Sequence, residues 1–211
     1  MIAVRRDIEK AAKVSHRRLK DITLVCVTKQ AGVGQIKEAM KCGVADIGEN
    51  RIQDAAEKYN ILGRAAKWHL IGHLQTNKVK KAVEIFDLIH SIDSLHLAET
   101  VSREAGKINK IQDVLIEVNT SREAGKFGVK QEETLPLLEQ IKILNNIRVL
   151  GFMTIAPLAD DSEKARPCFR RLKELSKAAG LGVLSMGMSQ DYQVAIEEGA
   201  TMVRVGSAIF K

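Results

Sequence analysis

Lys29 is the first residue whose position suggests chemistry. It follows the apolar run 24–27 (LVCV), so we expect its side chain to leave an apolar wall at the end of a strand. A lysine in such a place is expected to be partly desolvated, which lowers its pKa and makes the neutral amine that attacks carbonyl groups easier to form. The alternative is an ordinary solvated lysine at a strand end, because most lysines are exposed.

A second group of residues could bind an anion. The segment 185–189 (SMGMS) combines small residues with an expected helix start, where free backbone N–H groups can hold a phosphate. Gly187 permits close backbone approach, and Ser189 is placed to cap the following helix, which would by itself explain that serine. The loop after the next apolar run adds further donors. Together the two loops predict a phosphate site made by Ser185, Met186, Gly187, Ser189, Gly206 and Ser207.

Arg204 is unusual because the rest of its segment, 202–205 (MVRV), is apolar. An arginine in such a strand is buried only if it is paired. Either it contacts a ligand at the strand end, or it forms a structural ion pair with a carboxylate. The sequence leaves both possibilities open.

The histidines carry weaker signals. His69 and His73 are four residues apart, but they lie across an expected strand end and lack the glutamate of an HExxH motif. We therefore predict no metal site. His90 and Asp93 could form an acid–base pair or cap the helix that begins at Ser94, and capping is the favoured interpretation.

These residues fall at the ends of short apolar runs that alternate with helical patterns. The expected strands are 22–28, 44–48, 67–72, 88–92, 114–118, 149–154, 181–186 and 201–205. The expected helices between them are 35–42, 51–62, 77–85, 94–107, 131–144, 162–179 and 189–198. The strands are rich in Val, Ile and Leu without clean alternation, as in parallel strands covered on both faces.

Eight such units at similar spacing predict an α/β fold closed into a single (β/α)₈ TIM-type barrel, since closure removes edge strands. In a TIM barrel, functional residues lie at the carboxyl ends of strands, and phosphate sites favour the loops after strands 7 and 8. An open doubly wound sheet is the alternative. The segment 32–34 (GVG) lacks the third glycine of a dinucleotide motif, so it does not favour a nucleotide site.

Composition narrows the class of protein. The 211 residues are 45% hydrophobic and 28% charged, which fits one domain, residues 1–211. The net charge of +7 is scattered among acidic residues, and two Tyr and one Trp offer little stacking surface, so we predict no nucleic-acid partner. No apolar run is long enough to span a membrane, and the basic first 20 residues form an amphipathic helix rather than a signal peptide. The three cysteines include no CxxC motif, so they indicate neither a disulfide framework nor a zinc site. We expect a cytoplasmic monomer.

Several segments together resemble the pyridoxal phosphate homeostasis proteins, also called the YggS-like or PROSC family. The resemblance runs from about residue 8 to the C-terminus, and the pair LSMGMS and VRVG is its most specific part. The matching segments are 27–29 (VTK), 48–50 (GEN), 68–72 (WHLIG), 90–93 (HSID), 184–189 (LSMGMS) and 203–206 (VRVG).

The resemblance implies a fold-type III barrel similar to the N-terminal domain of alanine racemases. It also implies that pyridoxal 5′-phosphate (PLP) is held as a Schiff base on Lys29, with Asn50 near the cofactor and Arg204 facing its pyridine nitrogen. The loops 185–189 and 206–207 would hold the phosphate. Lys126 resembles a lysine in the family's fifth-strand loop.

The arginine and the tyrosines favour a carrier over a catalyst. A guanidinium is always protonated, so it donates to the ring nitrogen without giving up a proton, and an unprotonated pyridine is a poorer electron sink. A racemase would need a second domain with a tyrosine base, whereas Tyr59 and Tyr192 fall on expected helices and the chain ends at residue 211. We expect a PLP-binding protein of intracellular vitamin B6 homeostasis that supplies PLP-dependent apoenzymes. It would have no catalytic residues and no robust turnover, and the alternative is a slow PLP-dependent amino-acid racemase.

Overall fold

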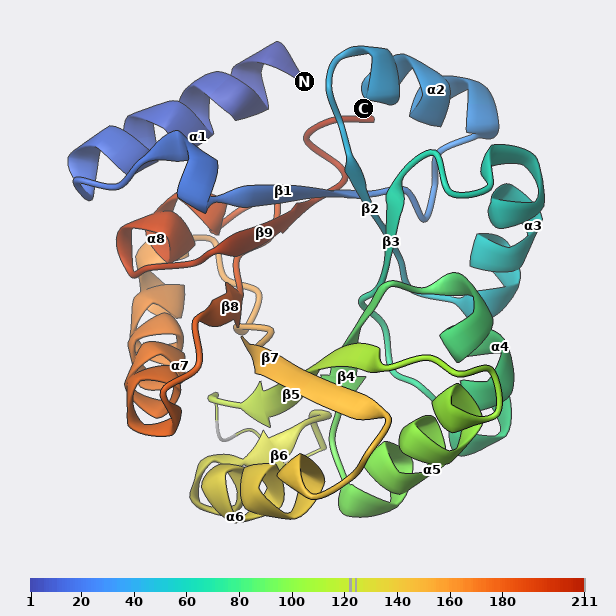
Figure 1. Ribbon diagram of the computed structural model, residues 1–211. Helices are drawn as coiled ribbons and strands as arrows, with labels where there is room; N and C mark the ends of the chain where they lie inside the picture. The colour runs from blue at the N-terminus through green and yellow to red at the C-terminus, as the bar shows by residue number, and fades with distance from the viewer. Residues whose placement is uncertain (122, 124, 211) are drawn as a thin grey trace.

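The computed structural model describes residues 1–121, 123 and 125–210, and within them eight parallel strands close into a barrel (Figure 1). Around the ring each strand pairs with a neighbour on both sides. The pairings include β4 with β5, β5 with β7, and β1 with β9, so the ring has no open edge. The barrel strands are β1 (Thr23–Val27), β2 (Asp46–Glu49), β3 (Lys67–Leu70), β4 (Leu88–Ile92), β5 (Gln112–Asn119), β7 (Ile147–Met153), β8 (Val183–Ser185) and β9 (Met202–Val205). The predicted barrel is confirmed, and the open-sheet alternative is wrong.

One short strand lies outside the ring and was not predicted. β6 (Val129–Lys130) pairs only with the carboxyl end of β5, through Val118 and Asn119. It belongs to the connection between β5 and the next helix, where two residues give too short a pattern to be found in a sequence.

Helices surround the barrel, one after each of the first seven barrel strands (Figure 1). They are α2 (Val33–Lys41), α3 (Ile52–Leu62), α4 (Val79–Ile85), α5 (Leu95–Gly106), α6 (Gln131–Lys142), α7 (Arg166–Ala179) and α8 (Tyr192–Glu197). Short 3₁₀ turns are η1 (Leu19–Asp21), η2 (Thr76–Lys78) and η3 (Ser162–Ala165). All seven predicted helices are present, with ends shifted by up to four residues. None of the helices described is both long and apolar enough to cross a membrane.

The N-terminal helix α1 (Ile2–Val14) completes the outer layer beside the β1–β9 seam (Figure 1). It buries Val4, Ile8, Ala11 and Ala12, the face that its amphipathic pattern predicts, and it packs against α8. After β9 the backbone turns, with the N–H groups of residues 209 and 210 both donating to the carbonyl of residue 206. Lys211, the last residue of the predicted domain, lies outside the described residues.

The core has two parts. Most buried apolar side chains, including Trp68, Phe86 and Phe169, fill the layer between strands and helices. A small separate cluster of Leu88, Leu115 and Met153 lies on three neighbouring strands, and we assign it to the inside of the barrel. Buried polar side chains share this interior, which leaves hydrogen-bonding groups beneath the carboxyl ends of the strands.

Candidate functional site

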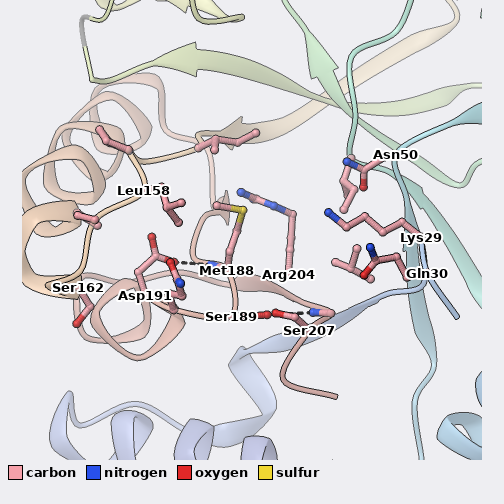
Figure 2. Close-up of a pocket in the computed structure, with 18 of the residues that line it drawn as sticks. Lys29, Gln30, Asn50, Leu158, Ser162, Met188, Ser189, Asp191, Arg204 and Ser207 are labelled. Carbon is pink, nitrogen blue, oxygen red and sulfur yellow. Dashed lines mark hydrogen bonds between the residues drawn. The ribbon is translucent and has the colours of Figure 1, made fainter. Parts of the chain in front are cut away.

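A cavity of about 410 Å³ opens at the carboxyl ends of the barrel strands, within the range of small-molecule sites. It is lined by residues from the ends of β1, β2, β8 and β9 and from the segment after β7. In Figure 2 the side chains of Lys29 and Arg204 extend toward the same space, with Ser189 and Ser207 along one side. The predicted site residues that line the cavity are Lys29, Asn50, Ser189, Arg204, Gly206 and Ser207.

Lys29 is held at the rim by its buried neighbour Thr28. The Thr28 hydroxyl donates to Glu49 Oε1 at 2.5 Å, and Lys58 Nζ donates to the same oxygen and to the Thr28 carbonyl, each at 2.6 Å. This clamp joins the ends of β1 and β2 and fixes the direction in which the chain leaves the barrel.

The expectation that Lys29 is partly desolvated is wrong, because its side chain is exposed. β1 ends at Val27, and Thr28 takes the last buried position. Lys29 therefore starts from the open mouth of the cavity and not from the apolar wall below it.

Arg204 is 3% exposed and held by two neutral acceptors. Its Nη1 donates to Ser185 Oγ at 2.6 Å, and its Nη2 donates to the Thr154 carbonyl at 2.8 Å. Burial lowers the pKa of Arg204 to about 10, and the negative charges of Asp191 and Glu117 oppose that change. These carboxylates lie beyond ion-pair distance among the described residues, so Arg204 is oriented by hydrogen bonds and still faces the cavity.

The two predicted phosphate loops meet at one side of the cavity. The Gly206 N–H donates to Ser189 Oγ at 3.3 Å, which leaves the Ser189 hydroxyl hydrogen available to another acceptor (Figure 2). Gly187 has a φ of 90°, and a Cβ at this position would lie 2.5 Å from the Cβ of Ala195. Only glycine allows the chain to pass so close to α8.

The helix cap was assigned to the wrong residue. α8 begins at Tyr192 with Asp191 as its N-cap, and Asp191 Oδ1 accepts from the Met188 N–H at 2.6 Å. Ser189 is therefore free of the capping role that the sequence suggested. Burial raises the pKa of Asp191, while the hydrogen bond from Met188 and the charge of Arg204 oppose the rise.

Two other predicted residues lie beneath the cavity. Met186 is fully buried in the core, and Met188, two residues later, lines the cavity. Ser185 is also fully buried, and its hydroxyl bonds to Arg204 and His90. Gly187, between Met186 and Met188, has a φ of 90°, so the chain is not extended there and the strand alternation that a sequence pattern assumes does not hold.

The sequence did not identify the segment after β7 as part of the site. Ile155, Leu158, Asp161 and Ser162 line the cavity, and Leu158 is 81% exposed. Figure 2 shows Leu158 and Ser162 across the cavity from Lys29. These residue types carry no chemical signature. Their position after a barrel strand was the one available signal.

The histidines occupy two separate places. His90 bonds to His69 and Ser185 inside the barrel, whereas His73 Nδ1 lies 3.5 Å from Asp93 Oδ2. The proposed pair of His90 and Asp93 is thus replaced by other partners. Ser94 caps α5 by accepting from the Leu97 N–H. Within the described ranges, no group of three or more His, Cys, Asp or Glu side chains is arranged for a metal ion.

A closed parallel barrel, with a lysine after its first strand and an arginine in its last, defines a protein of the fold-type III class. The model of the family described as alanine racemase, N-terminal domain, matches residues 3–211. An alanine racemase structure from Clostridium difficile 630 superposes with a TM-score of 0.77 at 16% identity, covering 98% of this chain and 56% of that one. That likeness supports the fold alone.

Relatives over nearly the whole chain are more informative. The pyridoxal phosphate homeostasis protein of Aquifex aeolicus is 43% identical over 210 residues, covering 96% of this chain and 92% of the relative. The protein of the same name from Synechocystis is 39% identical over 197 residues, covering 90% of each chain. PipY of Synechococcus elongatus, solved with PLP bound, has a TM-score of 0.83 at 34% identity, covering 97% of this chain and all of that one. The chain belongs to the alanine racemase N-terminal domain family and, within it, to the pyridoxal phosphate homeostasis proteins.

Proposed function

We propose that this chain binds PLP as a Schiff base on Lys29 and acts in vitamin B6 homeostasis. The observation that carries the proposal is the meeting of Lys29, Arg204 and the Ser189–Gly206 contact in one cavity. The family relationship supports it, because PipY has been solved with PLP and the curated relatives are named for PLP homeostasis.

The residues of the cavity fit three of the polar parts of PLP. Lys29 offers a primary amine to the aldehyde, and Arg204 offers N–H donors to the pyridine nitrogen. Ser189, Gly206 and Ser207 form the side suited to the phosphate, where Gly187 keeps the backbone close. Asn50 lies at the rim beside Lys29 (Figure 2). Ser185 is assigned to Arg204 and not to the phosphate, because its hydroxyl is already bonded below the cavity.

Each residue has a binding or orienting role. PLP when bound supplies an aldehyde and an electron-withdrawing ring. Lys29 supplies the amine for covalent attachment. The clamp of Thr28, Glu49 and Lys58 fixes the backbone from which the Lys29 side chain extends. Arg204 donates to the ring nitrogen and keeps its own proton, because burial leaves its pKa at about 10, above neutral pH.

Retention of the cofactor, rather than turnover, is the activity that we assign. Removal of an α-hydrogen on both faces needs a second base opposite the lysine. The Tyr192 hydroxyl donates to Asp7 on α1, and Tyr59 packs edge-on against Trp68, so neither described tyrosine is directed at the cavity. We further propose that residues 1–211 act as one cytoplasmic, monomeric domain that supplies PLP-dependent apoenzymes.

Borohydride trapping tests the covalent assignment. The protein is mixed with PLP, reduced with borohydride, digested and mapped for the modified peptide. We expect one pyridoxyl group on Lys29 in the wild type and none at equal protein concentration in Lys29→Ala. Lys126→Ala is the matched control, since Lys126 pairs with Glu123 in the β5–β6 connection, and it should be labelled like the wild type. Full labelling of Lys29→Ala at another lysine would overturn the assignment.

A further inference from the structure

Side chains from five strands form an unbroken chain of hydrogen bonds through the barrel. Asp46 Oδ1 lies 3.0 Å from His69 Nε2, and His69 Nδ1 lies 2.9 Å from His90 Nε2. His90 Nδ1 lies 2.9 Å from Ser185 Oγ, which accepts from Arg204 Nη1 at 2.6 Å. β4 and β8 are separated by β5 and β7 around the ring, so the contact between His90 and Ser185 must cross the barrel interior.

The chain joins the two ends of the barrel. Asp46 is the first residue of β2 and lines a second cavity, of about 870 Å³, between the strand starts and α1. Ser185 is the last residue of β8, and Arg204 lines the candidate PLP site. The side chains between these cavities are nearly or fully buried: His69 is 2% exposed, and His90 and Ser185 are fully covered. Each polar atom in this region therefore needs its neighbour in the chain as a hydrogen-bond partner.

The carboxylate at one end determines the direction of every bond. A carboxylate can only accept, so Asp46 takes the hydrogen of His69 Nε2. With that hydrogen in place, a bare His69 Nδ1 can accept from His90 Nε2. Burial above all, together with the charge of Arg204, lowers the pKa of His90 well below its usual value, so this ring is neutral. Its bare Nδ1 then accepts the hydrogen of Ser185, whose lone pair accepts from Arg204. No donor faces a donor in this arrangement.

We propose that Asp46, acting through His69 and His90, is a positioning residue for Arg204. The carboxylate fixes the tautomers of both rings, and the ordered chain holds the guanidinium by Ser185 while other N–H groups face the cavity. The consequence for PLP rests on the proposed function, in which Arg204 contacts the pyridine nitrogen. The tautomers do not depend on it.

Nitrogen NMR of the cofactor-free protein labelled with ¹⁵N-histidine tests the chain directly, because protonated and bare ring nitrogens have different shifts. We expect the hydrogen on Nε2 and a bare Nδ1 in both His69 and His90. A hydrogen on Nδ1 of either ring, or a charged His90, would overturn the proposal whether or not the protein binds PLP. Absence of PLP trapping on Lys29 would instead overturn the proposed function and leave this result standing.

Two near-isosteric variants then test the role of the carboxylate. Asp46→Leu removes the acceptor, and we expect mixed tautomers at His69 and His90 and about a tenfold loss of PLP affinity. Asp46→Asn keeps an acceptor oxygen and should restore the Nε2–H tautomers and most of the affinity. Asp113→Leu is the control, since Asp113 also lies near a strand start but pairs with Arg148 on the surface, and it should change neither readout.

If Asp46→Leu fails to fold, the wild-type tautomers and Asp46→Asn still decide the question. Wild-type tautomers and unchanged PLP affinity in a folded Asp46→Leu protein would overturn the positioning role. Equal losses in Asp46→Leu and Asp46→Asn would also overturn it, because the amide keeps the acceptor.

Discussion

We expect Glu117 to lower the stability of the folded protein as the pH rises. Its carboxyl group on β5 is 6% exposed, and burial together with the negative charge of Asp93 raises its pKa to about 7, with Arg204 opposing the rise. In the unfolded chain the same group has an ordinary pKa near 4.5. The folded protein therefore holds this proton more tightly than the unfolded chain does, and folding is penalised once the proton is lost.

The size of the effect follows from the two pKa values. A pKa raised from 4.5 to about 7 corresponds to about 3 kcal/mol, at about 1.4 kcal/mol for each pH unit. The stability linked to protonated Glu117 is fully present below pH 4.5 and is lost as the pH rises to about 7. Glu117→Gln resembles the protonated acid at every pH. We expect the variant and the wild type to be similar near pH 4.5, with the variant about 3 kcal/mol more stable at pH 8.

Urea unfolding of the cofactor-free protein from pH 4.5 to 8.5 measures this difference. Comparison of variant with wild type at each pH cancels the other titrating groups. Glu104→Gln is the control, because Lys107 lowers the pKa of Glu104, so this group titrates below the range and its removal should give a nearly constant difference from wild type. A difference between Glu117→Gln and wild type that does not change with pH, or that shrinks as the pH rises, would refute the reasoning.

Three further predictions concern the site and its supports. Ser189→Ala and Ser207→Ala should each weaken PLP binding by about 1.5–3 kcal/mol in a titration, the usual worth of a hydrogen bond to a charged group; unchanged affinity in both would place the phosphate on backbone groups or elsewhere. Lys58→Met should cost about 3 kcal/mol in urea unfolding, because it leaves the fully buried Glu49 carboxylate without its cation, and adding Glu49→Gln should recover most of that loss. In deuterated water with L-alanine and PLP, the protein should show at most slow exchange of the α-hydrogen and no sustained racemisation; many turnovers of racemisation, abolished by Lys29→Ala, would make it an enzyme.

Local signals account for what was predicted correctly. Most barrel strands lie in short apolar runs, and the outer helices have apolar faces, so both can be recognised from neighbouring residues. Lys29 comes two residues after the first run, and Arg204 interrupts the last, so their places at the strand ends could be predicted. Ser189 was expected to cap the helix, but α8 begins three residues later, at Tyr192, and the Ser189 hydroxyl accepts from the Gly206 N–H instead.

The sequence by itself determined the barrel class, the order of its strands and the residues that reach the carboxyl ends. Only the tertiary structure decided which side chains meet inside the ring. His69 and His90 are 21 residues apart, His90 and Ser185 are 95 apart, and no local pattern links them. Closure of the barrel brings β4 across from β8, and burial then requires every polar group there to find a partner. The physical reason is that strand formation depends on neighbouring residues, whereas hydrogen bonds across the barrel interior depend on all eight strands being in place.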